Sequence, residues 1–466
     1  MTFRDLRGWI RFLEEEGELL RINDEVKLEP DVAAIGKAIC ESEGPGVFLE
    51  KIAGYTTPLT IGLHASWRRA ALALGLKKDA TREEQLAAWH RGWKRFPVAR
   101  VEVGKAPCKE NKMVGGEVNL FAFPIPRVNQ QDGSFYICKP CCITRDPDTG
   151  VVNIGMYRMM ILDRAKTGIL IPSHQDAGRS YAKYLRRGQT MEMAVALGTE
   201  PILPMVAGTR IPPDWSEYDF AGALKGEPVE VVRGETVDLP VPAGAEIVLE
   251  GEVGPEKAFE GPFGEYHGAY SGYLRLPVFS IRAVSHRNHP IFDTLYIGRP
   301  NSENHYMTLF GKLVGAEEEM KRFVPSITRM AYLGPYGMNA VIQGRWRHSG
   351  EPRRAMNAWW GSSFGPHAKL LVCVDEDVDP WNPFDVMWAI ATRVQGERDI
   401  VLMPHSEGVL DPTSNREGLS CKIGIDATKP RYPAYSYDPV DWVTEPPGTA
   451  QWKEKILQQW NRGRNP

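Results

Sequence analysis

AEIVLEGEV, at residues 245–253, and YLRLPVFSIRAVSH, at residues 273–286, are apolar and β-branched runs that predict two long strands. Shorter runs of the same kind occupy 151–163, 167–171 and 228–239. Helical patterns near 176–187 and 214–225 interrupt these strands. We therefore expect residues 114–312 to form a mainly β, barrel-like domain with inserted helices.

On both sides of this segment the pattern alternates between helices and strands. Before it, helices are expected at 3–16, 30–42 and 79–95, with strands at 17–22 and 47–52 between them. After it, helices at 311–324 and 384–394 alternate with strands at 340–346, 370–374 and 400–404. The fold class predicted is α/β with a β centre, in three domains at 1–113, 114–312 and 313–466.

The last helical pattern, at 449–464, places an apolar face at the end of the chain. Its apolar residues at helical spacing are Trp452, Ile456, Leu457 and Trp460. Such a face must pack on another surface. A neighbouring subunit is one candidate.

Composition excludes several classes of protein. With 56 Lys and Arg against 59 Asp and Glu in 466 residues, the formal charge is −3, which argues against nucleic-acid binding. The apolar runs are far shorter than the ~20 residues that a membrane span needs. Charges run through the first residues, so no signal peptide is expected and the protein is predicted to be cytoplasmic. Cys138, Cys141 and Cys142 could hold zinc or a redox pair, but a second ligand pair at matching spacing is missing.

Two carboxylates, Glu260 and Glu265, flank a Gly-Pro-Phe-Gly turn. In a straight strand they would lie about 17 Å apart on opposite faces, whereas the turn lets both enter one pocket. Repulsion would then separate their pKa values and leave one protonated as a general acid. On spacing alone, a polar turn with two solvated glutamates is equally open. The following Tyr266, His267 and Tyr270 add a possible proton relay.

An amide and a guanidinium lie on the strand that carries Asn153 and Arg158. Arg158 could hold a substrate carboxylate and keep a neighbouring glutamate ionised, or serve as a structural ion-pair partner. Ser173-His174 and Ser216-Glu217 each begin an expected helix, where backbone amides favour phosphate. An amide, an imidazole and a carboxylate together would suit Mn²⁺ or Mg²⁺. Ordinary helix capping is the alternative.

Five segments together resemble the UbiD family of reversible, prenylated-FMN-dependent decarboxylases. They are NIGMYR (153–158), Ser173-His174, SEYDFAGALKGEPVEVV (216–232), AEIVLEGEV with EGPFGEYHG (260–268), and CKIGIDATKP (421–430). The resemblance spans nearly the whole chain. It implies an N-terminal α/β domain, a flavin-reductase-like split β-barrel that binds cofactor and metal, and a C-terminal α/β dimerisation domain with a docking C-terminal helix.

The resemblance also implies roles for individual residues. Arg158, Glu260 and Glu265 match the catalytic ion-pair network, with Glu265 as the proton donor. Asn153, His174 and Glu217 match the ligands of a divalent metal, usually Mn²⁺, and a K⁺ ion would share Glu217 and take carbonyls near 206–209. The positions that match cofactor contacts are Asn153, Ile154, Gly155, Met156, Tyr157, Arg158, Ser173, His174, Glu217 and Lys422.

The reaction implied is a non-oxidative, reversible decarboxylation of an aromatic or heteroaromatic acid. The prenylated flavin would form a covalent adduct with the substrate carbon, and Glu265 would then deliver the proton that replaces CO₂. Arg299, Asn304 and His305 lie in a segment similar to a pocket-proximal part of aromatic-acid members, and could hydrogen-bond a ring heteroatom or be structural. Many phenolic-acid enzymes have Trp in place of Asn301, which argues against a simple hydroxybenzoate substrate.

The partners implied are a small carboxylic acid and CO₂, a flavin prenyltransferase that supplies the cofactor, and a second copy of the chain or more. Four other functions compete with this one. They are a decarboxylase of α,β-unsaturated acids in the same family, a glycosidase using Glu260 and Glu265 at ~5 Å, a non-catalytic flavoprotein or assembly subunit, and a conventional FMN oxidoreductase.

Overall fold

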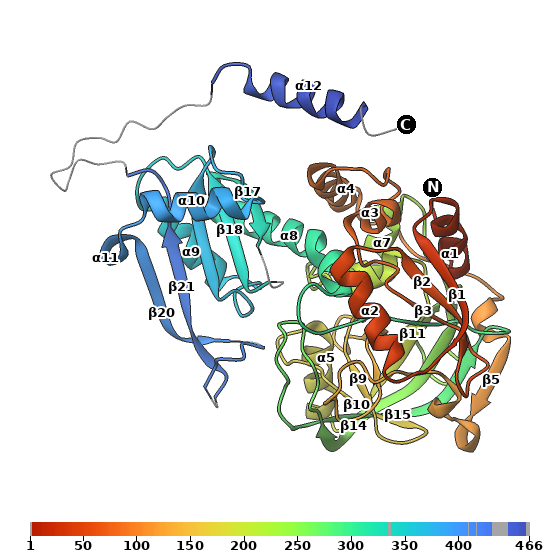
Figure 1. Ribbon diagram of the computed structural model, residues 1–466. Helices are drawn as coiled ribbons and strands as arrows, with labels where there is room; N and C mark the ends of the chain where they lie inside the picture. Colours follow the sequence, from red (N-terminus) through yellow and green to blue (C-terminus); the bar gives the residue numbers. More distant parts are fainter. Residues whose placement is uncertain (1, 334–336, 409, 416, 431–445, 463–466) are drawn as a thin grey trace.

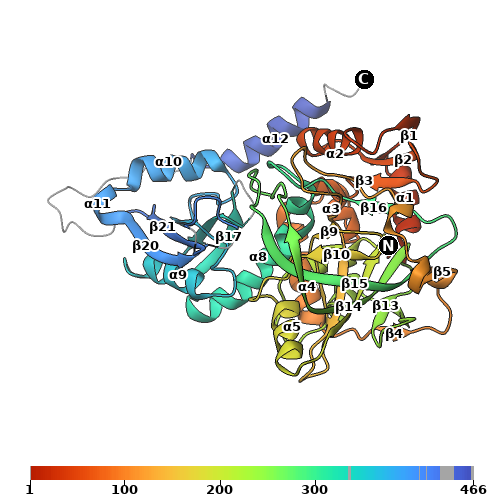
Figure 2. The same ribbon diagram turned by 90° about the horizontal axis from the view of Figure 1, so that it is seen from below.

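The computed structural model describes residues 2–333, 337–408, 410–415, 417–430 and 446–462, with side chains in the last range as far as Ile456. The chain forms a mixed α/β structure with three parts, as predicted. Figures 1 and 2 both place the long helix α8 (Glu303–Phe323) between the C-terminal sheet and the rest of the chain.

The N-terminal part is a four-stranded sheet in the order β1-β2-β3-β16. Its fourth strand comes from within the predicted middle domain and pairs parallel to β3. The predicted helices at 3–16, 30–42 and 79–95 are confirmed, and Thr81 and Glu84 form a capping box that fixes the start of the third. The elements are α1 (Leu6–Glu15), β1 (Leu19–Val26), α2 (Asp31–Ser42), β2 (Gly46–Ile52), β3 (Leu59–Ile61), α3 (Trp67–Ala73), α4 (Arg82–Arg95) and β16 (Phe292–Thr294).

The central part is a nine-stranded sheet built around a long antiparallel hairpin, β14 (Ile247–Glu260) and β15 (Leu274–His286). These are the two runs that open the sequence argument. The order is β6-β9-β10-β15-β14-β11-β7-β8, and β5 also pairs with β15. The remaining strands are β5 (Asn111–Val114), β6 (Tyr136–Ile137), β7 (Cys141–Arg145), β8 (Val152–Gly155), β9 (Met159–Ile161), β10 (Lys166–Ile169) and β11 (Met191–Leu197).

The predicted β centre is therefore confirmed, but strand pairing among the described residues follows an open path and closes no barrel. Both predicted inserted helices are present, and a short helix rich in apolar residues lies between them. These helices are α5 (Asp176–Arg186), α6 (Ile202–Ala207) and α7 (Glu217–Lys225). A small sheet beside them contains β4 (Val101–Glu102), β12 (Glu230–Arg233) and β13 (Pro240–Pro242).

The C-terminal part is a five-stranded sheet in the order β17-β18-β19-β21-β20. Its strands are β17 (Ile327–Tyr332), β18 (Asn339–Gly344), β19 (Leu370–Asp375), β20 (Ile400–Glu407) and β21 (Leu419–Asp426). Its helices are α9 (Glu351–Gly361), α10 (Pro383–Arg393) and α11 (Gly396–Asp399). The last helix, α12 (Thr449–Arg462), lies apart from this sheet (Figure 1). Its Trp452 and Ile456 side chains are exposed. The side chains of Leu457 and Trp460 lie outside the described residues.

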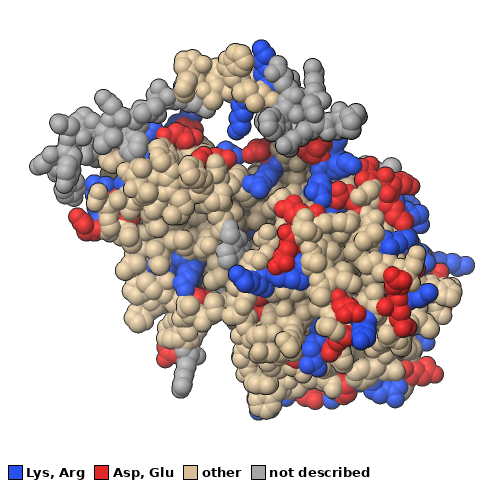
Figure 3. All heavy atoms as spheres, viewed as in Figure 1, with Lys and Arg blue, Asp and Glu red and all other residues tan. Residues whose placement is uncertain are grey.

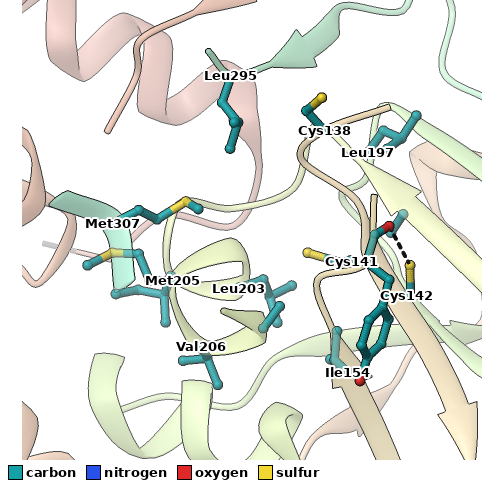
Figure 4. Packing of buried hydrophobic residues seen from close by; sticks show 14 of the residues in the cluster. Cys138, Cys141, Cys142, Ile154, Leu197, Leu203, Met205, Val206, Leu295 and Met307 are labelled. Atoms are coloured by element: carbon teal, nitrogen blue, oxygen red, sulfur yellow. Dashed lines mark hydrogen bonds between the residues drawn. The ribbon is translucent and has the colours of Figure 1, made fainter. Parts of the chain in front are cut away.

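One large core extends through all three parts, and a smaller cluster lies within the C-terminal part. Cys138, Cys141 and Cys142 are buried in the large core as free thiols (Figure 4). The Cys142 thiol donates to the Tyr157 carbonyl at 3.9 Å, and burial raises the pKa of each of the three thiols. They therefore serve as apolar packing residues.

The surface carries charges of both signs. Lys and Arg are interspersed with Asp and Glu on the face that Figure 3 shows. No helix within the described residues is both long and apolar enough to cross a membrane.

Candidate active site

A deep cleft lies where the central part, α8 and the C-terminal part meet. Its empty space is about 1420 Å³, including the portion open to solvent. The central part contributes residues 153–158 from β8 and the chain after it, Glu217 from α7, and Phe263, Glu265 and Tyr266 from the β14–β15 turn. From the C-terminal side come Tyr332, Phe364 and His367. The wall of the cleft is thus shared between parts that are far apart in sequence.

At one end of the cleft, Arg158 binds two glutamates at once. Its Nε and Nη2 donate to the two oxygens of Glu260 at 2.9 and 3.0 Å, and its Nη1 donates to Glu265. All three side chains are buried. The guanidinium also lies over the Phe263 ring, with 4.7 Å from Cζ to the ring centroid. The structure thus brings together the three residues predicted to form an ion-pair network.

The two glutamates differ in what they can do. Both oxygens of Glu260 are occupied by Arg158, so this carboxylate is fixed in place. Glu265 lines the cleft. Burial raises the pKa of Glu265, Arg158 opposes that rise, and the negative charges of Glu260 and Asp132 add to it. A carboxyl group of this kind can hold a proton and release it to a bound molecule.

A second group of polar side chains lies on β8 and α7. Glu217 accepts from Asn153 Nδ2 at 2.8 Å and from the Ile154 N–H at 2.7 Å. Burial raises the pKa of Glu217 to about 8. Asn153 Oδ1 and His174 Nε2 are both buried and have no hydrogen-bond partner within the described part of the chain.

These atoms fit a bound cation. Burial and the nearby Arg210 lower the pKa of His174, which favours the neutral imidazole that binds metals. An orphaned amide oxygen, an imidazole nitrogen and a carboxylate form a plausible donor set for Mn²⁺. Among the described residues, however, no group of three or more His, Cys, Asp or Glu could hold a metal. The donor set depends on the amide of Asn153.

Three further basic side chains line the cleft. They are Arg210, Lys312 and His367, and the His367 ring lies against that of His174 with centroids 5.8 Å apart. Burial and Arg210 lower the pKa of Lys312 to about 7. The sequence reasoning missed all three. One signal was available for Lys312, because Asn304, Thr308 and Lys312 follow each other at four-residue spacing and all line the cleft.

The other predicted site residues are placed as follows. The cleft is lined by the segment directly before Arg158, namely Ile154, Gly155, Met156 and Tyr157. Asn304 also lines the cleft. Ser173 and Arg299 are exposed and are not part of its lining.

Two predicted contacts are used elsewhere. His305 is buried, and its Nδ1 accepts from the Ser302 N–H at 3.0 Å in a capping box at the start of α8. Lys422 is buried on β21 and donates to the Pro366 carbonyl at 3.0 Å, one residue from His367. Lys422 does not line the cleft. Its positive charge nevertheless helps to lower the pKa of His367, which does line it.

Of the predicted relay residues, Tyr266 lines the cleft beside Glu265. The His267 Nδ1 accepts from the Ala269 N–H at 3.2 Å within the turn, and the Tyr270 hydroxyl accepts from the Gln131 N–H at 3.0 Å. No chain of hydrogen bonds through all three is formed among the described residues.

Comparison with known proteins agrees with this fold and identifies the family. The three family models of 3-octaprenyl-4-hydroxybenzoate carboxy-lyase (UbiD) match in order: the N-terminal domain at residues 10–89, the Rift-related domain at 99–300 and the C-terminal domain at 305–427. The chain belongs to the UbiD family of decarboxylases.

The relatives match over their full length. A phenolic acid decarboxylase from Sedimentibacter hydroxybenzoicus is 36% identical, over 98% of each chain. One from Bacillus subtilis is also 36% identical, over 99% of this chain and 100% of that one.

Solved structures give the same result. The vanillic acid decarboxylase of S. hydroxybenzoicus in its closed form has a TM-score of 0.92 at 35% identity over 99% of both chains, against 0.87 for the open form. The UbiD-class enzyme HmfF from Pelotomaculum thermopropionicum, in complex with FMN, has a TM-score of 0.82 at 32% identity, over 96% of this chain and 98% of that one.

Proposed function

We propose that this protein catalyses the non-oxidative, reversible decarboxylation of an aromatic or heteroaromatic carboxylic acid with prenylated FMN. The observation that carries the proposal is the buried Arg158–Glu260–Glu265 group, of which Arg158 and Glu265 line the cleft. Two relatives named phenolic acid decarboxylase, and an evolved dimeric form of HmfF solved with prenylated FMN at 30% identity, support it.

Each member of the group has a distinct task. Arg158 supplies a fixed positive charge, and Glu260 holds that guanidinium in one orientation through two parallel hydrogen bonds. Glu265, whose raised pKa favours the protonated form, delivers the proton that replaces CO₂. When bound, prenylated FMN supplies the electron sink for the carbon that loses its carboxylate.

The opposite end of the cleft would hold the cofactor phosphate. The backbone of residues 153–157, the basic side chains of Arg210 and Lys312, and the imidazole of His367 are the groups available to it. Asn153, His174 and Glu217 would bind Mn²⁺ there, and K⁺ would share Glu217 and the carbonyls near Ala207, which line the cleft beside it. A flavin prenyltransferase would supply the cofactor.

Phenolic acids are the first substrates to test, because the relatives carry that name. Asn304 is the predicted substrate contact that lines the cleft, as do Tyr266 and Ile297. It offers an amide to a hydroxyl or a ring heteroatom. Arg299 and His305 would act on substrate only indirectly, since neither lines the cleft.

The glycosidase alternative requires a free carboxylate nucleophile. Glu260 is fully buried and has both oxygens hydrogen-bonded to Arg158, so it is not a free nucleophile. A non-catalytic flavoprotein would not need the buried Glu265. Decarboxylation of α,β-unsaturated acids remains the second candidate within the family, and such acids belong in the same substrate panel.

A homodimer formed through the C-terminal part is also proposed. Edge strand β20 exposes Leu402, and α10 exposes Phe384 and Met387. Exposed apolar side chains on a sheet edge favour pairing with a second chain. Sedimentation of the purified protein, with Leu402→Glu as the variant, tests this.

The deciding experiment uses protein co-expressed with a flavin prenyltransferase. Its ultraviolet–visible spectrum and intact cofactor mass are recorded, and CO₂ release is then measured with a panel of phenolic, heteroaromatic and α,β-unsaturated acids. Prenylated FMN together with CO₂ from one aromatic or heteroaromatic acid supports the proposal. Bound flavin that NAD(P)H reduces, with no CO₂ from any acid, would support an FMN oxidoreductase instead.

A further inference from the structure

A loop at residues 128–133 lies directly against the turn that carries Glu265. The Gly133 N–H donates to the Pro262 carbonyl at 2.7 Å, and the Gly264 N–H donates to Asp132 Oδ1, also at 2.7 Å. On the far side of Glu265, the Gln131 N–H donates to the Tyr270 hydroxyl at 3.0 Å. The loop therefore holds the turn both before and after the proton donor.

The approach is too close for larger residues. A Cβ at Gly133 would overlap the Gly261 carbonyl, and one at Gly264 would overlap the Asn129 side chain. The Asn129 Nδ2 also donates to the Ile297 carbonyl at 2.8 Å, next to the chain that leads into α8. Loop and turn thus pack as one unit.

Asp132 is the centre of this unit. Its Oδ2 accepts from the Asn129 N–H at 2.8 Å and from the Val128 N–H at 3.2 Å, which closes the loop on itself. Its Oδ1 is left for Gly264, the residue directly before Glu265. The side chain is 2% exposed. Burying a carboxylate costs free energy, which the three N–H donors must offset. An exposed side chain could close the loop without that cost, so loop closure alone does not explain why Asp132 is buried.

We propose that Asp132 is a positioning residue for Glu265. Its carboxylate fixes Gly264, and through it the backbone of the proton donor, in register with Arg158. This inference rests on the proposed function, in which Glu265 delivers the proton.

The charge of Asp132 acts in the same direction. The ionisable groups that face Glu265 are Arg158 from the chain after β8, Glu260 from the end of β14, Asp132 from the loop, Tyr266 beside it and the thiol of Cys138. Of these, Glu260 and Asp132 raise the pKa of Glu265, whereas Arg158 lowers it. Removing the charge of Asp132 lowers the pKa of Glu265, so the donor loses its proton at a lower pH.

The test compares Asp132→Asn with Asp163→Asn in holoenzyme. Asp163 is a matched control, because it accepts the Ala165 N–H at 2.7 Å in an exposed turn of the same sheet and does not line the cleft. For Asp132→Asn we expect unchanged flavin content, a kcat lower by about tenfold to a hundredfold, little change in KM, and an alkaline limb of the kcat profile at lower pH. Asp163→Asn should match the wild type in all four.

A wild-type kcat and pH profile in Asp132→Asn would overturn the inference. Tyr270→Phe provides a second variant that removes one hydroxyl from a partly exposed ring, so it decides the question if Asp132→Asn does not fold. A kcat lower by about twofold to fivefold supports the proposal that this loop positions Glu265, and an unchanged kcat overturns it. Failure of the proposed function is recognised separately, since Glu265→Gln would then be as active as the wild type.

Discussion

Asn304 and Lys312 lie two turns apart on one face of α8, and both line the cleft. Eight residues of helix span about 12 Å, so this face runs from the neighbourhood of Glu265 to the cluster of Arg210 and His367. One helix therefore contributes to both the proposed substrate end and the proposed phosphate end. Any tilt of α8 changes both ends together.

Replacing Glu265 with Gln should abolish decarboxylation while leaving the cofactor in place. The amide keeps the shape of the side chain but carries no transferable proton, so we expect a rate lower by about 10²–10⁴-fold. CO₂ release and flavin content are measured on the same preparation. Glu256→Gln, in an exposed ion pair with Lys166, is the control. Full activity in Glu265→Gln would remove it as the donor.

The decarboxylation rate should fall at alkaline pH. The active form of Glu265 is protonated, and because burial raises its pKa the protonated form persists to a higher pH than an exposed glutamate allows. As pH rises through that pKa, the donor is lost and kcat declines by about tenfold per pH unit. A pH profile of kcat measures this, and a rate that increases steadily through the same range would contradict it.

His174→Ala should release the metal and weaken cofactor binding. Its Nε2 is buried and has no hydrogen-bond partner within the described residues, so it is available to a cation. Losing a direct ligand should cost more than the about 10–100-fold in metal affinity that loss of an outer-shell partner costs. Elemental analysis and flavin absorbance after dialysis give the result. His90→Ala, whose ring pairs with Glu317 outside the cleft, is the control. Tightly bound Mn²⁺ and flavin in His174→Ala would refute the assignment.

Lys312→Met should reduce flavin retention more than Lys321→Met. Both lysines lie on α8, but Lys312 lines the cleft while Lys321 pairs with Glu317 outside it. A charge-assisted hydrogen bond to a phosphate contributes about 1.5–3 kcal/mol, so Lys312→Met should weaken flavin binding by about tenfold to a hundredfold. Fluorescence titration of FMN into apoprotein measures both variants, and equal affinities would exclude Lys312 from the phosphate end.

Lys139→Met should destabilise the whole fold. Lys139 is buried, and its Nζ lies 3.1 Å from both Glu303 and Asp293. The pKa of Glu303 is lowered to about 2, since Lys139 and His64 outweigh burial. Its contribution to stability is thus present above about pH 4.5, the value without these partners, and is lost as pH falls towards 2.

The expected cost of Lys139→Met is about 3–5 kcal/mol at neutral pH. The difference from wild type should shrink as pH falls from 4.5 towards 2, because Glu303 without the lysine can then take up a proton and lose its uncompensated charge. Thermal unfolding at several pH values gives the comparison, with the exposed Lys166→Met as control. Equal Tm values for wild type and Lys139→Met would show that the buried group adds no stability.

The elements that sequence predicted best are those with local signals. The alternating runs at 245–253 and 273–286 became the β14–β15 hairpin, and the Gly-Pro-Phe-Gly turn brought Glu260 and Glu265 to one arginine. α6 was missed because ILPMVA is short, uniformly apolar and contains Pro204. β16 was missed because three residues show no period, and its position depends on a partner more than two hundred residues earlier.

The site residues also divide into those with a local sequence signal and those without one. The segment 153–158 and Glu217 carry recognisable motifs, and the structure places them on adjoining elements. Arg210, Lys312 and His367 come from three separate elements, so their proximity follows only from the packing of α8 and the C-terminal part. Asp132 has no motif of its own and acts through a backbone N–H.

The position of β16 has a consequence for biosynthesis. Chains generally begin to fold from the N-terminus while they are still on the ribosome. Here the N-terminal sheet cannot gain its strand at Phe292–Thr294, nor Lys139 its partner Glu303, until nearly two thirds of the protein has been translated. Until then the edge of β3 in the nascent chain stays unpaired. An unpaired strand edge can pair with another chain, so we expect the nascent chain to need a chaperone most before β16 has been translated.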